Sequence, residues 1–256
     1  MYDSKYFLGH EPILRSRTVY WCGTDQKELF YKHMKDLDTR QQLEELGYDE
    51  NSIEYSYNEY GFRCGTFPDH NNTIMFLGCS YTEGVGLRYE DVYANKVAKE
   101  LGLDCVNLGV GGSGNDGSLR RASYWIPKLQ PKIVVHQGTF KDRIEFPFKE
   151  EYVTRAGYQQ QDWAKDFYNL SRKDKLFFRE SYRNAVMHPI HLDFLYDKNM
   201  YAIKGICNTF GSQYFHFDFS VFNFHSNKYA RDLSHPGVQA HQELTDYVIQ
   251  LINGYK

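Results

Sequence analysis

Short apolar runs that each end in a turn dominate the chain from residue 73 onward. The runs are TIMFLG at 73–78, DCVNLGV at 104–110, KIVVHQG at 132–138 and QYFHF at 213–217. Helical stretches separate or follow them, at about 91–101, 118–129 and 236–253. Because the runs are short and mostly apolar on both faces, they predict strands buried on both sides. Strands that alternate with helices predict an α/β fold with a central parallel sheet.

An N-terminal arm and an insertion within the core lie outside this alternation. Residues 1–70 hold a charged helical stretch at 25–47 and then alternating aromatics in IEYSYNEYGF, which predict an N-terminal arm packed on the core. Residues 71–256 are expected to form one core domain, with a charge-rich helical insertion at about 141–212. A chain of 256 residues is long enough for such a core.

The overall charge and the cysteines exclude several classes of protein. The formal net charge is −3, which gives no support to a nucleic-acid or anionic-membrane partner. Five cysteines are widely spaced without a C-x-x-C motif, which disfavours a disulfide framework or a zinc ribbon and suits a reducing compartment. No apolar run approaches the length of a membrane span, and MYDSKYFLGHEPILRSR lacks the apolar centre of a signal peptide. We therefore expect a cytoplasmic protein.

A serine follows directly where the first apolar run ends. Gly78, Cys79 and Ser80 form a small turn before the next helix. One interpretation is an ordinary bend, because Gly and Ser are favoured turn residues. The other is that Ser80 is a nucleophile, because α/β sheets carry their chemistry at the carboxyl ends of their strands.

A glycine-rich turn, NLGVGGSGNDG at 107–117, follows the second run. Gly109, Gly111 and Gly114 fit the dinucleotide fingerprint G-x-G-x-x-G. That fingerprint expects an acidic residue at the end of the next strand, which here ends in VVHQG. The alternative is that backbone N–H groups of this turn face an anion or a developing oxyanion, which needs no cofactor.

An acid–histidine pair lies in ARDLSHPG, near the C-terminus. Asp232 and His235 are three residues apart, just before a proline that is suited to begin a helix. An aspartate that accepts from the histidine Nδ1–H leaves Nε2 as a base, as in a Ser-His-Asp triad. The alternative is that Asp232 or Ser234 caps the last helix and that His235 is a surface residue.

Together these motifs resemble the SGNH/GDSL hydrolase superfamily over residues 73–256. FLGCSYTEG resembles the first family block, NLGVGGSGND the second and DLSHPG the last. The upstream YSYNEYGFR is similar to members from phages and marine microbes, which suits a virus-encoded protein made in a host cytoplasm.

The resemblance implies a flavodoxin-like three-layer α/β/α fold and a serine esterase without a cofactor. It places Ser80 as the nucleophile, with His235 and Asp232 completing the triad. It gives the oxyanion hole to the backbone N–H groups of Ser80 and Gly112. The expected substrates are small-molecule or carbohydrate esters, or lipid esters.

The sequence departs from the family pattern in two places. Cys79 replaces the usual aspartate, where a small buried cysteine is expected, and Phe140 in QGTFKDRIEF occupies the position of the third-block oxyanion asparagine. We expect Asn115 to replace that donor, with helix capping by Asn115 or Asp116 as the alternative. Arg143 is the candidate for binding an anionic substrate group. The substitution at Phe140 also leaves open a silent binding or virion-structural module, and an acyltransferase remains a further alternative.

The remaining histidines are expected to be structural. His136 and His216 lie in apolar strand patterns and are predicted to be core residues. His188 and His191 are three residues apart, but no cysteine or paired acid completes a ligand set, so no metal site is predicted.

Overall fold

The computed structural model describes residues 14–148, 151–155, 182–221 and 229–254, together with Phe177 and Glu180. A parallel sheet lies at its centre. Its strands, in spatial order, are β4 (Asp104–Asn107), β3 (Thr73–Leu77), β5 (Ile133–Gly138) and β8 (Gln213–Asp218). In chain order this arrangement is 2-1-3-4, as in flavodoxin-like sheets. All four strands expected from the apolar runs are confirmed.

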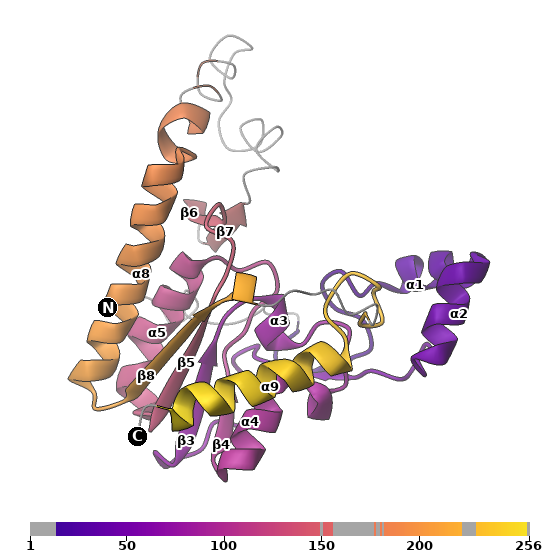
Figure 1. The fold of residues 1–256 in the computed structure, drawn as a ribbon, viewed down its shortest axis with the longest axis horizontal. Helices are drawn as coiled ribbons and strands as arrows, with labels where there is room; N and C mark the ends of the chain where they lie inside the picture. The colour runs from indigo at the N-terminus through magenta and orange to yellow at the C-terminus, as the bar shows by residue number, and fades with distance from the viewer. Residues whose placement is uncertain are drawn as a thin grey trace.

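Helices cover both faces of this sheet (Figure 1). One face carries α4 (Tyr93–Leu101) and α9 (Val238–Asn253), and the other carries α5 (Asn115–Leu129) and α8 (Pro189–Thr209). Alternate residues of β3 enter different cores, since Phe76 packs with α4 and α9 while Met75 packs with α5 and α8. The predicted three-layer α/β/α architecture is therefore confirmed.

The N-terminal segment forms a small structure of its own. Strand β1 (Thr18–Val19) pairs antiparallel with β2 (Tyr55–Ser56), and helices α1 (Lys27–Lys35) and α2 (Leu37–Glu45) lie between them in the chain. Figure 1 shows both helices beyond the start of α9. Their apolar residues form a separate buried cluster, against which Leu233 of the core also packs. The N-terminal segment therefore contacts the core through apolar side chains.

The segment 141–212 departs from the helical insertion that the sequence predicts. It begins with an antiparallel hairpin of β6 (Ile144–Phe148) and β7 (Glu151–Arg155), and continues with the π-helix η5 (Tyr182–Val186) and α8. The expectation of helix is wrong at the hairpin, because IEFPF and EYVTR are rich in aromatic and β-branched residues and contain a proline. The parts of the expected insertion at 149–150, 156–176, 178–179 and 181 lie outside the described residues. Helix α8 packs on α5 and is part of the core layer.

No helix among the described residues has both the length and the apolarity needed to cross a bilayer. The short elements α3 (Ser80–Glu83), η3 (Tyr89–Asp91) and η6 (Phe219–Val221) complete the set in that part of the chain.

Three histidines of the core are hydrogen-bonded to neighbouring groups, and burial lowers the pKa of each, so they stay neutral. His136 contacts the Tyr214 hydroxyl and His216 contacts the Tyr196 hydroxyl, which agrees with the predicted structural role. His241, on α9, accepts the backbone N–H of Tyr93 at 3.1 Å, at the first residue of α4. Burial, together with the nearby positive charge of Lys96, lowers the pKa of His241 to about 3.

We predict that His241→Asn makes folding less sensitive to acid. The pKa of His241 is about 3 in the folded protein, below roughly 6.5 for an unfolded histidine. Its contribution to stability is therefore complete above about pH 6.5 and is lost as the pH falls toward 3, by up to about 1.4 kcal/mol per pH unit. Asparagine offers Tyr93 an acceptor that does not titrate. Urea unfolding between about pH 7 and pH 5 measures the slope, and an unchanged slope in the variant would show that His241 is not the responsible group.

Candidate active site

A sharp turn after β3 presents Ser80 at the carboxyl edge of the sheet. Ser80 begins the four-residue helix α3, and Cys79 before it is extended and buried. A side chain at Gly78 would collide with the Thr82 side chain, so only glycine permits this turn. Strands β3 and β5 are neighbours in the sheet, but the chain continues from β3 to β4 on one side and from β5 to β8 on the other. Ser80 thus lies at the point where the strand order reverses, and ligands of open α/β sheets bind at this point.

The loop before α9 carries Asp232 and His235 in a fixed conformation. Ala230 donates its N–H to the His235 carbonyl at 2.9 Å, which closes the loop. Asp232 Oδ1 accepts the backbone N–H groups of Ser234 and His235, at 3.0 and 2.9 Å. Between them, Leu233 has a left-handed φ of 50°, a conformation that is uncommon for a branched side chain. The loop is therefore held by its own hydrogen bonds in a shape that it would not adopt freely.

Ser80, His235 and Asp232 form one chain of hydrogen bonds. His235 Nε2 lies 2.8 Å from Ser80 Oγ, and His235 Nδ1 lies 2.6 Å from Asp232 Oδ2. A carboxylate beside Nδ1 keeps the proton on that nitrogen, so Nε2 accepts the serine hydroxyl proton. The edge of the neighbouring Tyr81 ring packs against the imidazole, with centroids 5.5 Å apart. The three residues that the sequence predicted for the site lie together.

Asp232 is a strong candidate for a permanently ionised group. Its side chain is fully buried, which pushes the pKa of the carboxyl upward. Hydrogen bonds from His235 and Thr24 and the charge of His235 outweigh this effect and lower the pKa of Asp232 to about 2. The carboxylate therefore stays charged at neutral pH.

The glycine-rich turn packs directly against α3. A side chain at Gly109 would collide with the backbone of Thr82 and Glu83, and the Gly111 N–H donates to Glu83 Oε2 at 2.6 Å. Gly112 has a left-handed φ of 74° and open space beside its Cα. Within the described part of the chain, the N–H groups of Ser80 and Gly112 have no hydrogen-bond acceptor. Two free donors next to a serine suit an oxyanion better than a dinucleotide phosphate.

A buried carboxylate fixes the position of this turn. Glu83 is fully buried, and besides Gly111 it accepts the Tyr57 hydroxyl at 2.8 Å on Oε1. Burial, followed by the charge of Glu83, raises the pKa of Tyr57, so its hydroxyl remains protonated and donates. Tyr57 follows β2 in the N-terminal segment, so this segment helps to hold the turn.

The Asn115 side chain is bound to the backbone of Thr139. Its side-chain NH₂ donates to the Thr139 carbonyl at 3.1 Å, and its Oδ1 accepts the Thr139 N–H at 3.0 Å. These two bonds join the start of α5 to the residue that follows β5 and use one of the two N–H groups of the amide, so the role as an oxyanion donor stays a prediction. The Asn115 side chain does not cap the helix, whose N-cap is Gly114.

The residues around the altered third block lie beside the glycine-rich turn. Phe140 is 38% exposed and contacts Phe219, with ring centroids 4.2 Å apart. The Arg143 guanidinium lies 4.6 Å from the centre of the Phe140 ring, and its backbone carbonyl packs against Gly114. Arg143 thus adjoins the turn that carries Gly112, as expected of a residue near the mouth of the site. No group of three or more His, Cys, Asp and Glu side chains suited to a metal occurs among the described residues.

Sequence reasoning missed the contribution of the N-terminal segment. Thr24 donates its hydroxyl to Asp232 Oδ2 at 2.6 Å, and Tyr57 reaches Glu83 from the same segment. Both contacts join residues far apart in the chain, and no local motif marks them. Glu83 lies within the first family block, so its position beside Ser80 was the only available indication of a role.

Comparison with solved structures finds similar folds among esterases and acylhydrolases of the GDSL type. Esterase EstA from Pseudoalteromonas sp. is 16% identical, with a TM-score of 0.36, over 72% of this chain and 98% of that chain. A Clostridium thermocellum family 3 carbohydrate esterase is 14% identical, with a TM-score of 0.36, over 72% and 96%. The lipase/acylhydrolase from Enterococcus faecalis is 13% identical, with a TM-score of 0.35, over 72% and 96%. No protein-family model and no curated protein matches the sequence.

We predict that Asn115→Ala lowers stability much more than catalysis. The substitution leaves the buried N–H and C=O of Thr139 without their partners, which costs about 1–3 kcal/mol. Urea unfolding measures this loss, and Asn115→Asp is expected to destabilise as well, since it sets an oxygen against the Thr139 carbonyl. If Asn115→Ala instead unfolds like wild type and loses about 100-fold in kcat, Asn115 is an oxyanion donor after all.

Proposed function

We propose that the protein is a serine esterase that cleaves short acyl esters through Ser80, His235 and Asp232. The observation that carries this proposal is the continuous hydrogen-bond chain, 2.8 Å from Ser80 Oγ to His235 Nε2 and 2.6 Å from His235 Nδ1 to Asp232 Oδ2. A nucleophile, a base and a group that orients the base, in hydrogen-bond contact, are the arrangement that activates a serine.

The reaction proceeds in two halves. Ser80 Oγ attacks the ester carbonyl carbon while its proton passes to His235 Nε2, and the carbonyl oxygen becomes an oxyanion. The N–H groups of Ser80 and Gly112 donate to that oxyanion. The intermediate collapses when His235 returns the proton to the departing alcohol, which leaves an acyl group on Ser80. A water molecule then attacks the acyl carbon and gives a proton to His235. The second intermediate collapses when His235 returns that proton to Ser80 Oγ, which releases the acid and the free serine.

The residues around Ser80 limit the expected rate of ester hydrolysis and determine which substrates fit. Asn115 is engaged with Thr139 and Phe140 has no donor, so the proposed hole relies on backbone donors. Loss of one donor costs other hydrolases about 10²–10³ in rate, so we expect a slow esterase. Phe140 offers a partly exposed aromatic surface and Arg143 a positive charge, which suit a small ester, such as a carbohydrate ester, with an acidic substituent. An alcohol in place of water would make the same chemistry an acyl transfer.

We predict that Ser80→Ala abolishes hydrolysis of short-chain p-nitrophenyl esters without unfolding the protein. The serine is the proposed nucleophile, and alanine removes only its hydroxyl. Ser123→Ala on α5 is the control, because its hydroxyl is exposed and contacts only the Arg120 carbonyl of its own helix. The control should keep the wild-type kcat/KM. Ser80→Ala activity within about tenfold of wild type would exclude Ser80 as the nucleophile.

We predict that kcat/KM rises with pH as His235 loses its proton. Only neutral imidazole accepts the proton of Ser80. Because the pKa of Asp232 is about 2, the aspartate stays ionised over the assay range. Its protonation therefore does not contribute to the loss of activity at acid pH. The logarithm of kcat/KM should therefore rise with a slope of at most one at acid pH and then level off. Stopped assays on wild type between about pH 5 and 8 test this expectation, and a flat profile there counts against His235 as the base.

A further inference from the structure

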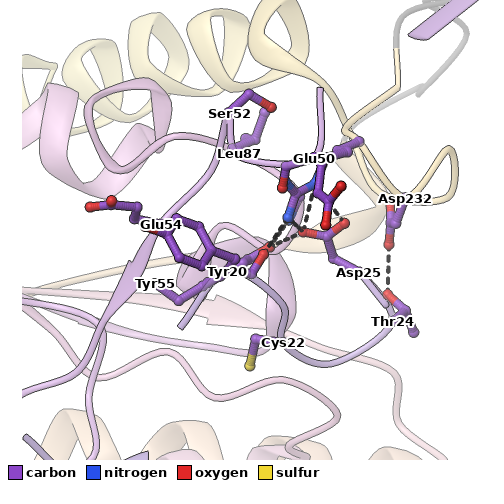
Figure 2. Close-up of polar contacts among 12 residues, drawn as sticks. Tyr20, Cys22, Thr24, Asp25, Glu50, Ser52, Glu54, Tyr55, Leu87 and Asp232 are labelled. Atoms are coloured by element: carbon purple, nitrogen blue, oxygen red, sulfur yellow. Dashed lines mark hydrogen bonds and ion pairs between the residues drawn. The ribbon is translucent and has the colours of Figure 1, made fainter. Parts of the chain in front are cut away.

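The N-terminal segment reaches the carboxylate of the proposed triad. Thr24 lies in the tight turn between Cys22 and Asp25, and its hydroxyl donates to Asp232 Oδ2 at 2.6 Å (Figure 2). The same hydroxyl oxygen lies 3.2 Å from His235 Nδ1. The contact joins residues 208 positions apart in the chain. It is therefore a product of the tertiary fold and not of the loop that holds Asp232.

The Thr24 hydroxyl completes the hydrogen bonding of Asp232. An ionised carboxylate has about four acceptor sites. Oδ1 accepts the N–H groups of Ser234 and His235, and Oδ2 accepts His235 Nδ1 and the Thr24 hydroxyl. Three of the four donors come from the loop itself. Thr24 supplies the fourth, on the oxygen that also holds the imidazole, and the Asp232 side chain is fully shielded from solvent.

A buried ion pair fixes Thr24 in this position. The next residue, Asp25, is 1% exposed and pairs with Arg231, the residue before Asp232, at 2.8 Å. Asp25 also accepts the Tyr55 hydroxyl at 2.6 Å, and that hydroxyl accepts the Gly86 N–H at 2.7 Å. Figure 2 shows the dashed line from Thr24 to Asp232, with Asp25 close beside Thr24. The two neighbouring pairs, Thr24 with Asp232 and Asp25 with Arg231, hold the segment and the loop in one register.

We propose that Thr24 is a positioning residue of the active site, which orients Asp232 and through it the His235 imidazole. This inference rests on the proposed esterase function. With the Thr24 hydroxyl on Oδ2, the carboxylate has one orientation in which all its acceptors are used, and His235 Nε2 then points at Ser80. Without it, Oδ2 loses a donor and the carboxylate and imidazole gain freedom to rotate.

The test exchanges the hydroxyl for a methyl group. Thr24→Val keeps the shape of the side chain, and Thr24 is exposed, so the variant should fold. We expect kcat for a p-nitrophenyl ester to fall about tenfold while KM changes less than about twofold. We also expect the low-field proton resonance of His235 Nδ1–H to move in the NMR spectrum. Thr24→Ser should restore both values, because it keeps the hydroxyl.

The controls separate this role from general stability. Thr18→Val removes a surface hydroxyl of the same segment that is hydrogen-bonded to Ser56 and not to Asp232 or His235, and it should leave kcat unchanged. A Thr24→Val protein with wild-type kcat and an unmoved resonance would overturn the inference and leave the esterase proposal intact. If Thr24→Ser is as slow as Thr24→Val, the hydroxyl is not the cause and the inference also fails. A wild-type protein without esterase activity would refute the proposed function, and the Nδ1–H resonance would still decide whether Thr24 positions the pair.

Discussion

The buried ion pair between Asp25 and Arg231 is the contact on which the site depends most. Both side chains are almost completely buried, so each charge needs the other to offset its desolvation. Removing one partner of such a pair costs about 3–5 kcal/mol of stability. Arg231 also donates to the carbonyls of Tyr20, Asp49 and Glu50 and lies over the Trp21 ring at 4.0 Å. One guanidinium thus ties the N-terminal segment to the loop that carries Asp232 and His235.

A second group of contacts holds the opposite side of the site. Glu83 binds Gly111 of the glycine-rich turn and Tyr57 of the N-terminal segment, and Arg63 donates to the carbonyls of Gly84 and Leu87 just beyond α3. The turn that carries Ser80 and the loop that carries Asp232 and His235 are therefore both held by the same N-terminal segment. Rigid support of this kind is what keeps catalytic groups within hydrogen-bond distance before a substrate arrives.

The sheet and the candidate residues Ser80, Asp232 and His235 could be predicted from the sequence because local patterns mark them. Apolar runs followed by turns define β3, β4, β5 and β8, and the parallel fold then brings strand ends together. Contacts that only the fold creates could not be predicted in this way. Asn115 lies in the expected turn, but only the fold shows that the Thr139 backbone takes its amide, and the contact of Thr24 with Asp232 spans 208 positions. The hairpin at β6 and β7 was overlooked because charged residues between its aromatics favoured a helical interpretation.

Covalent labelling shows whether Ser80 is an activated nucleophile. A fluorophosphonate probe reacts with a serine whose proton is removed by a neighbouring base. Wild-type protein should gain the mass of one probe, and peptide mapping should place that mass on Ser80. A protein that remains unlabelled, or that carries the probe at another residue, would contradict the account and favour a binding module that has the fold without the chemistry.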